Sequence, residues 1–117
     1  MQDAKSGARL AYLELTASDI DASMAFFSEA FGWDITRFAP TYAGTEGLGT
    51  DLGLAGGSEA VQAPPLAGVQ VSDLEAAQAA VEAAGGIVTQ PIFAFPGGRR
   101  FHFREPSGNE LSAFVYE

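Results

Sequence analysis

The sequence predicts an α+β protein made of two tandem β-α-β-β-β modules. Two observations lead to this prediction. Each half of the chain has a short alternating strand pattern, then an amphipathic helix pattern that ends at glycine. In addition, Ser18-Asp19-Ile20 recurs as Ser72-Asp73-Leu74, and Gly32 recurs as Gly86 at the same spacing. Such an internal duplication predicts that both halves form the same supersecondary unit.

The first strand is predicted at residues 9–17, where apolar and polar side chains alternate. The alternation places Leu13 and Leu15 beneath a helix and Tyr12 and Glu14 on the opposite face. Glu14 then has two interpretations. It is either a solvent-exposed charge on an open face or a carboxylate directed into a cavity.

A helix is predicted from Ile20 to Phe31, with Ser18 and Asp21 as its capping pair and Gly32 as its stop. Residues 33–38 have the composition of a strand. Residues 39–57 are rich in glycine, so we expect short strands there whose register the sequence does not define.

The pattern then restarts within a single domain, residues 1–117. Module one covers about residues 9–57, a linker covers about 58–65, and module two covers about 66–117. In module two a strand is predicted at 66–71, a capping box at Ser72 and Glu75, and a helix up to Gly85-Gly86.

The stretch at residues 97–111 concentrates turn residues, aromatic side chains and the only histidine. Its alternation predicts a strand with Phe101 and Phe103 packed under a helix and with Arg100 and His102 on the other face. The turn at residues 105–109 predicts a hairpin, and a returning strand follows at 111–116.

Composition excludes several classes of partner. The net charge of −9 disfavours nucleic acid. No apolar run is long enough to span a bilayer, and residues 1–8 lack the apolar core of a secretory signal. The absence of cysteine excludes disulfides and thiolate metal sites. We therefore expect a cytoplasmic protein without a membrane partner.

The basic residues are unevenly placed, since Arg99, Arg100 and Arg104 fall close together. They either pair with surface carboxylates such as Glu105 and Glu110, which contributes little stability, or hold the carboxylate or phosphate of a ligand.

The duplicated Ser-Asp-Ile/Leu helix starts, the Phe31-Gly32-Trp33 helix end and the strand-turn-strand at 97–116 form an ordered set. Over residues 9–116 this set resembles the vicinal oxygen chelate superfamily, which includes glyoxalase I, bleomycin-resistance proteins and extradiol dioxygenases. The resemblance implies an incomplete curved barrel around a ligand cavity, and a homodimer. Glu105 replaces the family's usual Asp, and a longer carboxylate predicts a less rigid turn.

The resemblance also implies a divalent metal held by His, Gln or Glu from equivalent strands. The corresponding positions here are Tyr12, Leu66, Ser112 and one residue within 56–59. Leucine cannot coordinate a metal, and neutral hydroxyls are poor ligands. We therefore expect no metal and no other cofactor.

His102 has two interpretations. It is either a structural histidine or an imidazole that like charge from Arg100 and Arg104 keeps neutral, so that it can exchange a proton near pH 7. A carboxylate at Glu14 could be its partner or the base itself.

These inferences predict a small-molecule-binding protein of the glyoxalase and bleomycin-resistance type, without the family metal, that binds an anionic or aromatic organic ligand. The predicted ligand-binding residues are Tyr12, Glu14, Arg100, His102, Ser112 and Phe114. One alternative is a metal-independent lyase or isomerase that uses Glu14 as base and His102 as acid. Another is a structural or partner-binding protein whose pocket is filled by its own side chains.

Overall fold

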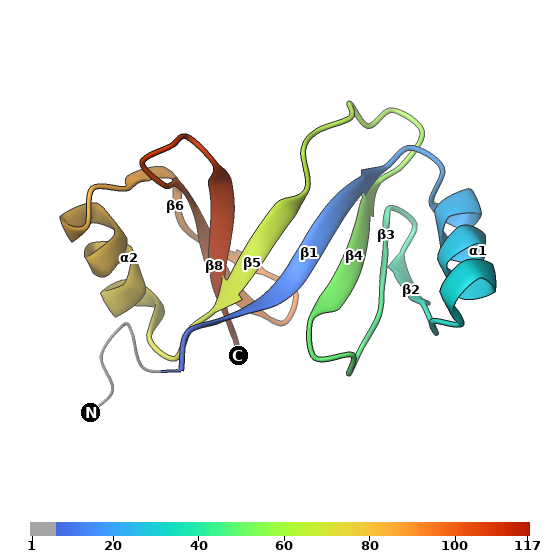
Figure 1. Ribbon diagram of the computed structural model, residues 1–117, viewed down its shortest axis with the longest axis horizontal. Helices are drawn as coiled ribbons and strands as arrows, with labels where there is room; N and C mark the ends of the chain where they lie inside the picture. Colours follow the sequence, from blue (N-terminus) through green and yellow to red (C-terminus); the bar gives the residue numbers. More distant parts are fainter. Residues whose placement is uncertain (1–6) are drawn as a thin grey trace. The chain divides into compact units, whose positions relative to one another are not determined.

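The computed structural model describes residues 7–117, which divide into two units (Figure 1). The N-terminal unit is residues 12–66, and the C-terminal unit is residues 67–117 together with residues 7–11. Each unit contains one helix and several strands, in the order strand, helix and three strands. The predicted α+β class with two β-α-β-β-β modules is confirmed.

In the N-terminal unit the strand order is β2-β3-β4-β1. β1 pairs in parallel with β4, in the register Tyr12↔Asp51 to Ala17↔Gly56, and the other pairs are antiparallel. The elements of this unit are β1 (Arg9–Ala17), α1 (Ile20–Phe31), β2 (Thr36–Ala39), β3 (Tyr42–Gly44) and β4 (Asp51–Gly56).

Helix α1 has the predicted bounds but a different cap. The backbone N–H of Ala22 donates to the Asp19 carboxylate (3.0 Å), so Asp19 is the N-cap. The predicted capping pair of Ser18 and Asp21 is therefore wrong by one position, and Asp21 instead forms an ion pair with Arg37. Gly32 ends the helix as predicted, with a φ of 71° that favours glycine.

The core of the N-terminal unit lies between α1 and the sheet. Leu15 packs against this core as predicted, but Leu13 is 36% exposed, so its predicted place beneath a helix is wrong. The contacts of α1 with the sheet are mainly with β3 and β4 rather than with β1. The buried members of the cluster are Ala17, Ile20, Ala43, Leu52 and Leu54.

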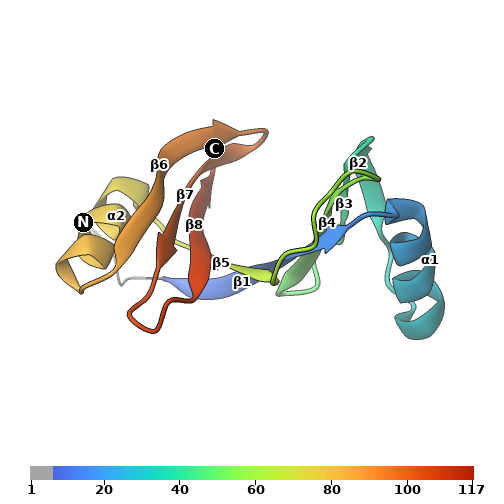
Figure 2. The same ribbon diagram turned by 90° about the horizontal axis from the view of Figure 1, so that it is seen from above.

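In the C-terminal unit the strand order is β5-β8-β7-β6, with β5 parallel to β8 and the other pairs antiparallel. Figure 2 shows α2 on one side of the strands β6, β7 and β8, each of which it contacts. The elements are β5 (Leu66–Gln70), α2 (Leu74–Ala83), β6 (Ile87–Phe95), β7 (Gly98–Arg104) and β8 (Glu110–Tyr116).

The cap of α2 repeats that of α1. The Asp73 carboxylate accepts the backbone N–H of Ala76 (3.0 Å), just as Asp19 accepts that of Ala22. The predicted capping box of Ser72 and Glu75 is wrong, because the Glu75 carboxylate bonds to Arg99 instead (2.5 Å).

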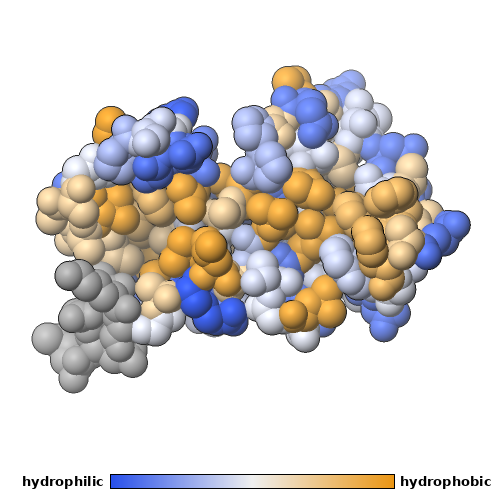
Figure 3. Space-filling view, viewed as in Figure 1, coloured by the Kyte–Doolittle hydropathy of each residue, from blue (hydrophilic) through white to orange (hydrophobic). Residues whose placement is uncertain are grey.

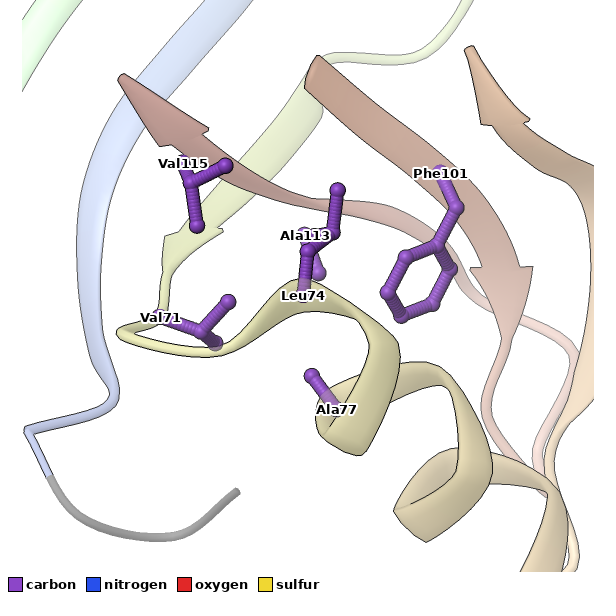
Figure 4. Packing of buried hydrophobic residues seen from close by; sticks show 6 residues of the cluster. All are labelled: Val71, Leu74, Ala77, Phe101, Ala113 and Val115. Carbon is purple, nitrogen blue, oxygen red and sulfur yellow. The ribbon is translucent and has the colours of Figure 1, made fainter. Parts of the chain in front are cut away.

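The core of the C-terminal unit confirms the predicted phase of β7. Phe101 is fully buried and its ring lies beside Leu74 and Ala77 of α2 (Figure 4), and Phe103 packs against the same cluster. The side chains of Arg100 and His102 therefore leave the opposite face of the strand.

The β7–β8 turn is more fully hydrogen-bonded than the sequence predicts. The Glu105 carboxylate accepts the backbone N–H groups of Ser107 (2.9 Å) and Asn109 (3.0 Å), and the Glu105 C=O accepts the N–H of Gly108 (2.8 Å). The longer side chain of Glu reaches two donors across the turn at once, so it caps the turn well.

The surface has an apolar area over α1, where Phe26 and Phe31 are each more than half exposed (Figure 3). Phe26, Phe27, Phe31 and Trp33 contact one another through their rings. No helix within residues 7–117 is long and apolar enough to cross a membrane.

Candidate functional site

The candidate site is the face of β7 that points away from α2. His102 lies at its centre, paired in register with Ser112 on β8 and with Gln90 on β6. His102 and Ser112 are both buried although both are polar. A buried polar pair on a sheet face needs partners, and these partners define the site.

The two ring nitrogens of His102 have different surroundings. Nδ1 lies 3.4 Å from Gln90 Nε2 and 3.8 Å from Glu110 Oε2. The Glu110 carboxylate is itself held by Thr89, whose hydroxyl donates to Oε2 (2.9 Å). Nε2 is buried and has no hydrogen-bond partner within the described part of the chain.

Arg100 lies on the same face, two residues before His102. Its guanidinium carbon is 5.2 Å from the centre of the Phe93 ring and 5.5 Å from that of Phe95, which is the geometry of a cation–π contact. Phe93 also contacts the His102 ring (5.6 Å between centres). Phe114 is the register partner of Arg100 on β8. The face therefore combines a cation, an imidazole and aromatic rings.

The surroundings of His102 on this face favour its neutral form. Burial lowers the pKa of His102, the charge of Arg100 lowers it further, and Glu110 opposes both effects. The predicted direction of the pKa shift is confirmed, but burial is its first cause. Arg104, the other predicted contributor, is not among the causes of the pKa shift; its side chain donates to the Gly108 carbonyl oxygen (3.4 Å).

Arg99 forms ion pairs at the surface. Its guanidinium contacts Glu75 (2.5 Å) and Glu117 (2.8 Å), and these carboxylates differ from the predicted Glu105 and Glu110. Glu105 caps the turn, and Glu110 faces His102. The basic patch of the sequence is thus divided between a surface ion pair and the candidate site.

The predicted site residues fall in two units. Arg100, His102, Ser112 and Phe114 come together on β7 and β8 in the C-terminal unit, whereas Tyr12 and Glu14 lie in the N-terminal unit. Within the N-terminal unit, Glu14 is half-buried opposite Gly53 of β4.

Tyr12 also lies against Gly53. The Tyr12 hydroxyl forms a hydrogen bond with the Tyr42 hydroxyl. A Cβ atom at Gly53 would lie 2.3 Å from the Tyr12 hydroxyl, so a larger residue at this position would displace the tyrosine pair.

Three of the four implied metal-ligand positions hold residues that do not suit a divalent metal. Leu66 has no donor atom, Ser112 offers only a neutral hydroxyl, and the Tyr12 hydroxyl is bonded to Tyr42. Among residues 7–117 no group of three or more His, Cys, Asp or Glu side chains could hold a metal ion.

Sequence reasoning missed Glu110, Gln90 and Phe93 as neighbours of His102. Glu110 could have been found, because the five-residue turn fixes Arg104 opposite Glu110 and hence places Glu110 diagonally across from His102. Gln90 and Phe93 could not have been found from sequence. The register of β6 on β7 shifts on both sides of Gln90, so the residues of β6 that face His102 do not follow from simple alternation.

Comparisons with known proteins agree with this fold. A family model described as the Glyoxalase/Bleomycin resistance protein/Dioxygenase superfamily matches residues 9–112. A comparison with curated proteins found no match.

Several solved structures share the fold. Methylmalonyl-CoA epimerase from Mycobacterium tuberculosis has a TM-score of 0.73 at 12% identity, over 92% of this chain and 87% of that one. A glyoxalase/bleomycin resistance protein/dioxygenase superfamily member from Vibrio splendidus 12B01 has a TM-score of 0.68 at 18% identity, over 92% and 98%. The Mn(II)-bound glyoxalase from Novosphingobium aromaticivorans has a TM-score of 0.67 at 22% identity, over 92% of this chain but only 40% of that one. Likeness at these identities shows a shared fold.

Proposed function

We propose a binding function for this chain, which belongs to the Glyoxalase/Bleomycin resistance protein/Dioxygenase superfamily. The proposed ligand is a small organic anion, bound at the face formed by Arg100, His102, Ser112 and Phe114. The observation that supports the anion is the position of Arg100. In a chain of net charge −9, this cation lies over two aromatic rings beside a buried imidazole. A guanidinium in that setting suits a carboxylate, and the rings suit an apolar or aromatic body.

Binding is proposed to need no metal. The donor set supports this, since Leu66 and Ser112 stand where the resemblance places ligands. We further propose a cytoplasmic homodimer. The exposed aromatic residues of α1 and the outer edge of β2 support self-association, because both are surfaces that a second copy could cover.

A metal-independent lyase or isomerase is the second candidate function. The observation that favours it is the buried, neutral imidazole of His102, which is suited to accept or donate a proton near neutral pH. A structural protein with a filled pocket would show neither binding nor turnover.

The test is thermal unfolding with matched ligand pairs. Benzoate and phenylacetate should raise the melting temperature, whereas benzamide and phenylacetamide should not, because a ligand of the native state stabilises by mass action and only the anions pair with Arg100. Arg100→Gln should abolish the shift. Arg104→Gln is the matched control, because Arg104 lies on the same strand but contacts the turn.

The same experiment tests whether ligand binding needs a metal ion. Adding Mn²⁺, Zn²⁺ or Ni²⁺ should leave the melting temperature and the benzoate response unchanged. A rise of several degrees with about one equivalent of metal, reversed by a chelator, would contradict metal-free binding. Equal responses to benzoate and benzamide would contradict the role of Arg100.

A further inference from the structure

The neighbours of His102 determine which of its nitrogens carries the proton. Glu110 Oε2 lies 3.8 Å from Nδ1 and, as a carboxylate oxygen, can accept but not donate a hydrogen bond. Gln90 Nε2 lies 3.4 Å from Nδ1, and a proton on Nδ1 goes with the turned amide, in which the Gln90 oxygen faces the ring; the two amide orientations are interchangeable in shape. We therefore assign the proton to Nδ1, where it faces a negative charge.

The other ring nitrogen, Nε2, then carries no proton and can act as a base. Nε2 is buried and has no hydrogen-bond partner among residues 7–117, and the His102 side chain is 10% exposed. A buried polar atom without a partner is rare in folded proteins, and a catalytic role is one physical explanation for it. Glu110 is held in place by Thr89, so the carboxylate that orients the ring is itself fixed.

We infer that His102 and Glu110 form a proton-transfer pair, in which Nε2 takes a proton from a small carboxylate bound at Arg100 and Glu110 orients the imidazole. This inference rests on the proposed anion site. His102 would be the catalytic residue, since Nε2 contacts the reacting hydrogen, and Glu110 a positioning residue. Glu14, the base in the lyase or isomerase alternative drawn from the sequence, has no part in this pair.

The spacing on β7 selects the class of substrate. Two residues on one face of a strand are about 7 Å apart, so Arg100 and His102 can hold opposite ends of one small molecule. The fitting ligand is a small carboxylate with an acidic C–H bond next to a second carbonyl group. Nε2 takes the proton, and the C–H electron pair remains on the ligand as an enolate. The imidazolium that forms is stabilised by the Glu110 charge. Return of the proton to the enolate at an atom other than the carbon it left gives an isomer of the ligand.

Nitrogen NMR of the imidazole tests the tautomer. The chain has one histidine, so in protein made without a histidine tag every imidazole signal belongs to His102. Near neutral pH we expect a protonated Nδ1 and a bare Nε2. Glu110→Gln should raise the fraction of the Nε2–H form, and Thr89→Val should do so to a smaller extent. Glu75→Gln, a carboxylate of the Arg99 ion pair, should not. A predominant Nε2–H form in the unaltered protein would overturn the inference.

Affinity alkylation tests the base and its anion together. Bromoacetate and bromoacetamide react with a bare imidazole nitrogen, which displaces bromide as the new N–C bond forms. The chain has no cysteine to compete, and peptide mapping separates adducts on its two methionines. Bromoacetate should modify Nε2 of His102 faster than bromoacetamide, and Arg100→Gln should remove that preference. Glu110→Gln should slow modification severalfold but keep the preference, and Arg104→Gln should change neither.

The two measurements separate failure of the pair from failure of the anion site. If Nε2 carries the proton while carboxylates still stabilise the protein through Arg100, the proton-transfer pair is overturned and the binding site stands. If Nε2 is bare but both reagents react equally and no carboxylate stabilises the protein, the anion site fails, and with it the assigned substrate class. Modification at Nδ1 instead of Nε2 would also overturn the pair.

Discussion

Single residues decide which face of β7 is core and which is site. Phe101 is fully buried against α2, whereas Arg100, its neighbour in sequence, lies on the opposite face over Phe93 and Phe95. Because strand side chains alternate, one position separates a packing residue from a ligand-binding one.

Truncation of Phe101 and of Arg100 to alanine should therefore lower the free energy of unfolding by different amounts. Phe101→Ala should lower the free energy of unfolding by about 3–5 kcal/mol through lost burial and the cavity it leaves. Arg100→Ala should change it by less than about 1 kcal/mol, because a half-buried side chain outside the apolar core is removed. Urea denaturation measures both values. A large loss for Arg100→Ala with a small one for Phe101→Ala would mean that the strand phase is reversed.

At the scale of elements, the same N-cap hydrogen bond occurs at the start of both helices. Asp19 and Asp73 cap α1 and α2 through equivalent hydrogen bonds, as expected for an internal duplication. The β7–β8 turn is fixed by another carboxylate, Glu105, which accepts two backbone N–H groups. The element that carries His102 is thus joined to Glu110 by a well-defined turn.

The turn predicts a pH-dependent contribution to stability. Hydrogen bonds from the backbone of Ser107 and Asn109 lower the pKa of Glu105 below 4.5. A carboxylate whose pKa is lower in the folded state stabilises the fold above its unfolded pKa and loses this contribution as pH falls through the folded pKa. Glu105→Gln should therefore destabilise the protein at neutral pH, and the difference from the unaltered protein should shrink as pH falls below 4.5.

Urea titrations across this pH range measure the difference. Glu59→Gln, in the segment between β4 and β5, controls for the loss of one negative charge. A Glu105→Gln effect that stays constant with pH would contradict the role of the charged turn cap.

At the scale of the molecule, the chain combines a strong negative charge with exposed aromatic side chains. Phe26 and Phe31 are more than half exposed on α1. Apolar area of this kind on a folded unit is typical of an interaction surface, and we have proposed a second copy of the chain as its partner.

The proposed homodimer has a direct test. Sedimentation at micromolar concentration should give twice the mass of one chain. Phe26→Glu together with Phe31→Glu should give the monomer, because four carboxylates would then face each other across a two-fold interface. Val61→Glu is the matched control, since Val61 is 87% exposed and lies outside α1. A monomer in the unaltered protein would contradict the proposal.

The sequence by itself determined the features that depend on neighbours along the chain. Helix bounds, the glycine stop at Gly32, the duplication and the phase of Phe101 all follow from periodicity and turn residues. The register of β7 on β8 belongs to this group too, because only a short turn separates the strands. Arg100, His102, Ser112 and Phe114 could therefore be placed on one face in advance.

Only the tertiary structure decided the surroundings of that face. The exposure of Leu13 depends on where α1 crosses the sheet, and the pairing of Gln90 and Phe93 with His102 and Arg100 depends on irregular pairing in β6. A register shift moves every later side chain relative to the partner strand, and local sequence does not reveal where it occurs. For this reason the imidazole was predictable from sequence, whereas its aromatic and amide neighbours on β6 were not.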